Sequence, residues 1–210
     1  MKKSMKTKSA IIALMLVACL AVAGVSAYFT DSAEAVNTFT IGEVNIELEE
    51  PNWEEPEVPV VPNQTVEKDP QAKNDGDNSA YIFMTVEVPY ANVITANADG
   101  TKNAAADTEL FTYTVNSGWA EIGTAKWENG IVTHTYAYGS ASELTELAAS
   151  AKTPALFNTI TFVNVIEGQS LEGTDKSVTV NAYAIQSENI GDSKAPDDVW
   201  TIICNQRDDV

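Results

Sequence analysis

The stretch from Ala80 to Val88 restricts the fold of this 210-residue chain more than any other feature. Every even position in it is apolar, so a period of two puts these side chains on one face of a strand. Tyr81 and Phe83 add apolar rings to the other face. Turn-forming residues precede the run at 74–79, and Pro89, which lacks an N–H donor, is expected to end its pairing. Because both faces need cover, we predict a central, buried strand.

Six further segments have the alternation of short strands. They lie at 44–49, 110–115, 125–128, 131–138, 156–165 and 177–185. Asn129-Gly130 separates two of them and favours a tight hairpin, since both residues tolerate positive φ. The acidic, proline-rich stretch 49–62 and the Ala/Asn/Asp/Gly-rich stretch 97–108 are expected to be surface loops.

Two segments favour helices. Ser140 and Glu143 form a capping-box pair, and leucine and alanine then recur at helical spacing up to Lys152, shortly before Pro154. A shorter helix is expected from Pro196 to Cys204. Short strands, frequent turns and a crossover helix together predict an all-β chain, a jelly-roll-type β-sandwich with one or two short helices in its connections.

The same patterns predict which side chains form the core. The expected core residues are Ile46, Ile82, Met84, Val86, Phe111, Tyr113, Phe162, Val180 and Ala182. Trp119 is expected to cap the core at one end of the sandwich, with its single N–H bonded. In the second helix, Val199, Ile202 and Ile203 are expected to face inward.

The N-terminus has the three-part pattern of a secretory signal peptide. Four lysines precede an apolar run at 10–24, and Val25 and Ala27 are compact residues at the positions that a signal peptidase reads. The run is short for a membrane span, which needs about 20 apolar residues. We expect cleavage before Tyr28, which removes 1–27 and releases a secreted protein without a membrane anchor. A retained anchor and lipid attachment at Cys19, which ends a lipobox-like sequence, stay as alternatives.

The charge of the chain limits its partners. It has 30 acidic and 12 basic residues and a net charge of −18, and the signal peptide contains four of the lysines. Such a surface repels nucleic acid and anionic lipid, so neither is an expected partner. Once Cys19 leaves with the signal peptide, Cys204 is the single cysteine, and no intramolecular disulfide can form. We expect Cys204 to be a small, buried apolar residue.

Several blocks of sequence resemble the TasA/camelysin (CalY) family of Gram-positive bacteria. The junction Ala27-Tyr28-Phe29-Thr30-Asp31 is similar to those cut by SipW-type signal peptidases. Further blocks follow in family order: Gly42–Ile46, Pro62–Val66, Lys68–Pro70, Lys73–Asn74, Gly76–Asp77, Ala80–Tyr81, Asn116–Trp119 and Ala182–Gln186. The resemblance implies a secreted jelly roll that forms fibres of the biofilm matrix, with a SipW-type signal peptidase as its processing partner.

Catalytic chemistry has little support in the residues. Camelysin-type relatives are classed as metallopeptidases, but a zinc peptidase needs about three protein ligands, and His134 is the single histidine of this chain. His134 lies in an alternating segment, where we expect a half-exposed strand histidine. No serine lies in a nucleophile elbow, and the apolar segment around Cys204 does not favour a nucleophilic thiolate. We therefore expect no enzyme activity and no cofactor. Calcium binding near Asn74–Asn78 stays open.

The segment 28–36 suggests a mode of assembly. It contains Tyr28 and Phe29 and no proline, and its end becomes free when the signal peptide is removed. We expect it to act as a donor strand on an open sheet edge of the next subunit, with Tyr28, Phe29 and Asp31 at the contact. The rest of the chain, 37–210, is the predicted sandwich domain. The expected partners are further copies of the chain and other matrix proteins. The alternative is a monomeric secreted or cell-surface binding module, and a metallopeptidase ranks last.

Overall fold

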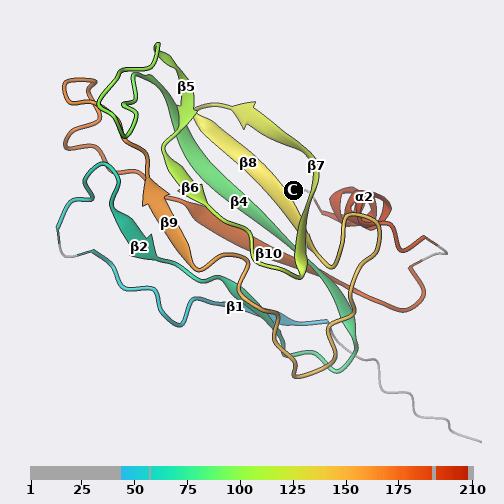
Figure 1. Ribbon diagram of the computed structural model, residues 1–210. Coiled ribbons are helices and arrows are strands. Elements are labelled where there is room, and N and C mark those ends of the chain that lie inside the picture. The colour runs from blue at the N-terminus through green and yellow to red at the C-terminus, as the bar shows by residue number, and fades with distance from the viewer. Residues whose placement is uncertain (1–43, 57, 191–192, 208–210) are drawn as a thin grey trace, which may run out of the picture. The chain divides into compact units, whose positions relative to one another are not determined.

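The computed structural model describes residues 44–56, 58–190 and 193–207, which belong to one compact unit (Figure 1). Its elements are β1 (Ile46–Glu49), β2 (Thr65–Glu67), β3 (Gln71–Asn74), β4 (Ala80–Val93), β5 (Ala106–Glu109), β6 (Phe111–Tyr113), β7 (Trp119–Glu128), β8 (Ile131–Tyr138), β9 (Thr159–Phe162), β10 (Thr179–Gln186) and α2 (Pro196–Gln206). Strands dominate, and α2 is the single helix of the described residues. The predicted all-β, sandwich-like fold is confirmed. No helix in this part of the chain is long and apolar enough to cross a membrane.

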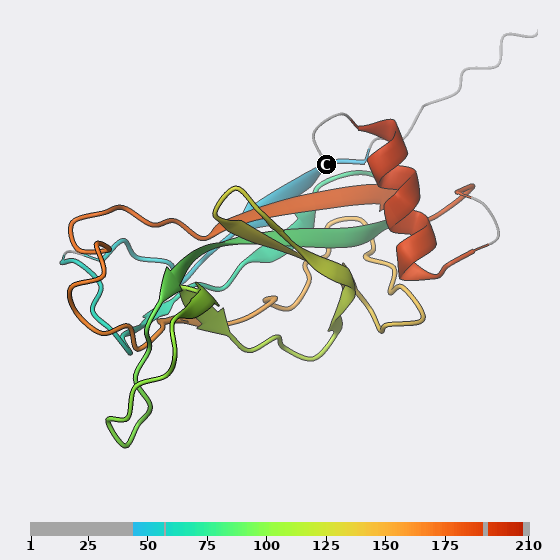
Figure 2. The same cartoon turned by 90° about the horizontal axis from the view of Figure 1, so that it is seen from above.

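The strands form three antiparallel sheets. The largest has the order β10-β4-β8-β7, and β5 pairs with the far end of β4. A three-stranded sheet has the order β2-β9-β6, and β1 pairs with β3. The small sheets pack on one face of the largest sheet, and α2 packs on its other face (Figure 2).

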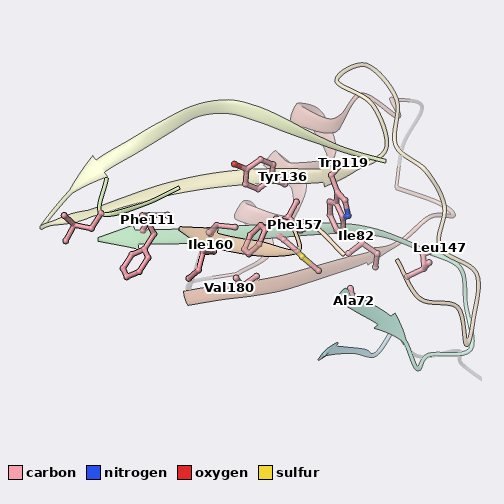
Figure 3. Close-up of a cluster of buried hydrophobic side chains, with 14 of the residues drawn as sticks. Ala72, Ile82, Phe111, Trp119, Tyr136, Leu147, Phe157, Ile160 and Val180 are labelled. Carbon is pink, nitrogen blue, oxygen red and sulfur yellow. The ribbon is translucent and has the colours of Figure 1, made fainter. Parts of the chain in front are cut away.

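Strand β4 is buried on both faces, as its sequence predicts. Its even-numbered side chains from Ala80 to Val88 join the cluster between the large and small sheets, which also contains Phe157 and Val180 (Figure 3). Tyr81 and Phe83 point the other way, into a second cluster that includes residues of α2. Fully burying a large apolar side chain stabilises the fold by about 1.5–3 kcal/mol, so this strand contributes to two cores at once.

The predicted core is confirmed in composition. All nine expected residues belong to the cluster between the sheets or pack against it, with Ile46, Tyr113, Phe162 and Ala182 only partly buried. Trp119 is buried, and its Nε1 donates to the carbonyl oxygen of Pro154 at 3.0 Å. Cys204 is half-buried rather than buried, because it lies on α2 beside the inward-facing Ile203.

The hairpin at Asn129-Gly130 is confirmed, with φ values of 52° and 84°. The prediction that Pro89 ends the pairing of its strand is wrong, since β4 continues to Val93. Pro89 marks the point where β5 replaces β10 as the neighbour of β4, since pairing with β10 ends at Glu87. On the β8 side, the N–H of Tyr90 still donates to the carbonyl oxygen of Gly130. The carbonyl oxygen of Pro89 accepts from the N–H of Leu110 at 2.8 Å, so the missing donor falls where the ladder changes partner.

The helix predicted at 140–152 is absent: the structure has an irregular crossover with isolated bridges there. Ser140 Oγ accepts from the N–H of Glu143 at 3.0 Å, as in a capping box. However, the N–H of Ser140 donates to the carbonyl oxygen of Glu143 at 2.8 Å, which closes a turn instead of opening a helix. Packing on both faces of the large sheet overrides the local pattern. Three other segments differ most from their predicted bounds: β7 begins six residues earlier than predicted, β5 begins inside the expected loop at 97–108, and β9 covers only part of 156–165.

Candidate functional site

The residues predicted to direct processing and assembly lie outside the described part of the chain. These are Val25 and Ala27 at the cleavage site, and Tyr28, Phe29 and Asp31 at the expected assembly contact. Cys19 lies outside it as well. Cleavage before Tyr28, lipid attachment and strand donation by 28–36 therefore stay predictions. The described domain has two other candidate functional sites, an open sheet edge and a groove.

The open edge is that of β10. This strand pairs with β4 in a regular register from Thr179 to Gln186, and no strand pairs with its other side within the described residues. Alternate residues such as Val180 and Ala182 pack toward the small sheets, while Tyr183 packs toward α2. The edge therefore continues two apolar layers, one on each face of the sheet.

The opposite edge of the same sheet, β7, is built differently. Its register shifts between Ile122 and Lys126, and Gly123 has a φ of +65° at this irregularity. A bulge bends a strand and disrupts the row of donors and acceptors that another strand would need. The two edge strands of the large sheet thus differ in how well they can pair with an added strand. The edge of β10 is regular, whereas that of β7 is interrupted.

The groove lies between β5 and β6 on one side and β7 and β8 on the other, and its volume is about 510 Å³. We call it the His134 groove. The register explains its floor: Tyr136 lies opposite Met84, and His134 lies opposite Val86, so both rings point to the inner face of the large sheet. Glu121 and Trp127 on β7 share that face. The small sheet covers the β4 side of this face and leaves the β7 side exposed.

His134 connects three strands across the groove. Its Nδ1 lies 2.7 Å from Oε1 of Glu121 on β7, and its Nε2 lies 3.1 Å from Oε2 of Glu109 on β5. Burial of the imidazole opposes its charged form, but the hydrogen bonds to both carboxylates outweigh burial and raise the pKa of His134 above 6.5. The sequence predicted only a half-exposed strand histidine. Its partners lie 13 and 25 residues away, and no local pattern links them.

Two tyrosines form the apolar side of the groove. The hydroxyls of Tyr113 and Tyr136 are hydrogen-bonded at 2.9 Å. Burial raises the pKa of Tyr113 above its usual range and raises the pKa of Tyr136 to about 12. Both phenols are therefore neutral at ordinary pH. The groove offers ring faces, hydroxyls and carboxylate oxygens to a ligand.

The described residues give little scope for a metal ion. The carboxylates of Glu109 and Glu121 bind different nitrogens of one ring, on opposite sides of it, so they do not converge on a point. No group of three or more His, Cys, Asp or Glu in this part of the chain has the geometry of a metal site.

Two of the polar side chains in the turn considered for calcium, Asn74 and Asp75, are bonded within the fold. The amide nitrogen of Asn74 donates to the carbonyl oxygens of Asn78 and Leu147, and its oxygen accepts from the N–H of Gly76. Asp75 forms an ion pair of 2.7 Å with Lys73, and this hydrogen bond lowers the pKa of Asp75. These contacts anchor the turn to the crossover.

Comparison of the chain with protein families, with curated proteins and with solved structures finds no match.

Proposed function

We propose that this protein is a secreted structural subunit of an extracellular or biofilm matrix, polymerising into fibres by head-to-tail strand addition. The donor is the segment 28–36, released by a SipW-type signal peptidase, and the acceptor is the open edge of β10 in the next subunit. One observation carries the proposal: a regularly paired, eight-residue edge strand whose outer side forms no strand pairing in the described domain, although β1 lies beside part of it.

The chemistry of the donor segment fits this edge. Neighbouring residues of a strand point to opposite faces, so Tyr28 and Phe29 would extend one face each. The β10 edge has an apolar layer on both faces, with Val180 on one and Tyr183 on the other. An added strand would satisfy the backbone groups of the edge while its two rings continue the two layers.

The symmetry of such a contact leads to a fibre. The donor segment and the acceptor edge are different surfaces of the same chain, so the contact is head-to-tail and need not close into a ring. Removal of 1–27 with its four lysines changes the net charge from −18 to −22, and this charge opposes side-by-side association. At about 0.15 M salt the Debye length is roughly 8 Å, so this repulsion leaves short-range strand pairing intact.

The direct test is deletion of 28–36 behind the intact signal peptide. Electron microscopy of the secreted protein should then show no fibres, and circular dichroism should show an unchanged β domain. Mass spectrometry of the unaltered protein should give Tyr28 as its first residue. Fibres that form equally well without 28–36 would contradict strand donation by this segment, and an N-terminal lipidated Cys19 would contradict the expected cleavage.

A crosslinking test distinguishes the two edges of the sheet. In a Cys204→Ser background, Phe29→Cys should form disulfide-linked chains with Thr179→Cys on β10. The matched control pairs Phe29→Cys with Glu128→Cys on β7, where we expect no linked chains. Crosslinking at β7 alone would show that the acceptor edge is wrongly assigned, even if the protein forms fibres.

A further inference from the structure

We propose that the His134 groove binds a cationic amino-sugar chain, that is, an oligosaccharide whose rings carry free amines. This binding site is separate from the β10 edge and does not need assembly, because a single domain contains all of its residues. Three observations carry the proposal: the exposed ring at the rim, the charge of the walls, and the paired backbone of the floor.

The rim holds an exposed aromatic platform. Trp127 is 48% exposed, although it lies on the inner face of the sheet with the buried Tyr136. Its ring packs at 4.9 Å from the ring of Tyr90 with an interplanar angle of 58°, so a neighbour fixes its orientation. The face of an indole carries partial negative charge and attracts both the C–H face of a sugar ring and an ammonium group. A rigid, exposed tryptophan beside a groove is therefore suited to stacking on a sugar.

The walls of the groove are acidic. Asp107, Glu109 and Glu121 line it, no lysine or arginine does, and His134, which is paired with two of these carboxylates, is the single basic side chain of the lining. Glu109 and Glu121 each use one oxygen for His134, and their other oxygens make no hydrogen bond within the described residues. Asp107 accepts at Oδ1 from the amide of Asn92 at 2.9 Å. Carboxylate oxygens accept hydrogen bonds from sugar hydroxyls and more strongly from ammonium groups, and they repel anionic ligands.

The floor of the groove favours a sugar over a peptide strand. Strand β8 pairs with β4 on one side and with β7 on the other, so its backbone groups are already bonded. A peptide that binds by strand addition needs free backbone donors and acceptors, which this floor does not offer. A sugar chain needs only side chains, and Thr108 and Thr112, whose hydroxyls donate to the carbonyl oxygens of Ala106 and Thr161, line the groove with the rings and carboxylates.

The experiment is an isothermal titration of the purified protein with a glucosamine oligomer and with the N-acetylated oligomer of the same length. The two probes share ring geometry and differ in charge. The glucosamine oligomer should bind at least about tenfold more tightly, because its ammonium groups pair with the wall carboxylates. Failure of the glucosamine oligomer to bind, or equal affinity for both oligomers, would overturn the proposal.

Two variants locate the binding. Trp127→Ala should weaken the binding of the glucosamine oligomer by roughly threefold to tenfold, since it removes a ring contact. Glu121→Gln should weaken it by about tenfold, since it removes a charged acceptor. Thermal melting of each variant checks that the fold is kept.

Two matched controls complete the test. Glu128→Gln makes the same charge change on the opposite face of β7, and Trp53→Ala removes another exposed tryptophan far along the chain. Neither should change the affinity. Equal losses in the controls, or equally tight binding of a lysine oligomer of the same charge, would reduce the effect to general attraction by an acidic surface and overturn the proposal. The titration measures binding by dissolved protein and does not require fibres. Failure of the fibre proposal would therefore leave the result of this test unchanged.

Discussion

Two segments of this chain have helical sequence patterns, and only one of them is a helix. The segment 140–152 has the stronger pattern, with a capping-box pair and leucine and alanine at helical spacing. It is an irregular crossover. The segment at the C-terminus has no side-chain cap at Ala195, yet it forms α2. The difference lies in what each segment must pack against.

The crossover serves both faces of the large sheet. Leu144 packs in the cluster that includes Tyr81 and α2, whereas Leu147 packs in the cluster between the sheets. On a helix, residues three apart lie on the same side, so one helix could not place these leucines in opposite layers. The backbone is instead bonded to the sheet: Leu147 and Ala80 exchange both of their N–H···O bonds, at 2.8 and 3.0 Å.

The helix α2 packs on one face only. Val199 and Ile203, four residues apart, are both buried against that face, and Trp200 packs on the rings of Phe83 and Tyr183. Pro196 begins the helix, and Asp197 and Asp198 lie in its first turn, where acidic side chains interact favourably with the helix dipole. A period of 3.6 therefore matches the single surface that this segment covers.

The largest effect is expected at Gly139, where the crossover begins. Its φ is +141°, and a Cβ there would overlap the carbonyl oxygen of Glu143 and the backbone of Leu144. Gly139→Ala should lower the free energy of unfolding by on the order of 4 kcal/mol, measured by urea denaturation. Gly123→Ala, at a positive φ with open space around it, should cost only about 1 kcal/mol. If Gly139→Ala and Gly123→Ala lowered the free energy of unfolding by similar amounts, the backbone of the crossover would have moved to make room for the added Cβ.

Truncation of the two leucines tests whether they occupy separate layers. Leu144→Ala and Leu147→Ala should each cost roughly 3 kcal/mol, because both side chains are buried. Amide hydrogen exchange distinguishes them: exchange in α2 should accelerate for Leu144→Ala and stay unchanged for Leu147→Ala. Equal acceleration in α2 would indicate that both leucines support the helix.

Proline substitution separates the two segments more directly. Thr201→Pro, in the middle of α2, should cost about 3 kcal/mol, since it removes a helical hydrogen bond. In the crossover, the N–H of Ala151 donates to the carbonyl oxygen of Ala148, and Ser150 has a φ of +62°. Ala149 is thus the second residue of a type II turn, where proline is favoured. Ala149→Pro should change the free energy of unfolding by less than about 1 kcal/mol, and a larger loss would point to a helix.

The smallest effect concerns the same turn. Ser150→Gly should raise the thermal midpoint slightly, because glycine adopts the positive φ at this position without steric strain. Relief of this strain should raise the free energy of unfolding by about 0.5–1 kcal/mol. The greater conformational freedom of glycine in the unfolded chain offsets part of this gain. Ser142→Gly, at an exposed crossover position where φ is not positive, is the control and should be neutral or destabilising. Equal destabilisation by both variants would contradict the turn geometry.

The sequence by itself determined the elements that pack in one regular way. The alternation at 80–88 marked a strand buried on two faces, Asn129-Gly130 marked a hairpin, and the spacing of Val199 and Ile203 marked a helix. Each pattern reports burial on a fixed side of its own element, so it can be read within a few residues. The nine expected core residues were found for the same reason.

The tertiary structure decided what depends on partners far along the chain. The crossover at 140–152, the continuation of β4 past Pro89 and the contacts of His134 with Glu109 and Glu121 all belong to this class. In each case a residue forms bonds with, or packs against, strands that only the fold brings near, and these contacts outweigh local propensities of at most about 1 kcal/mol per residue for residues other than proline. Periodicity shows that a side chain is covered, whereas only the arrangement of the sheets determines which residue covers it.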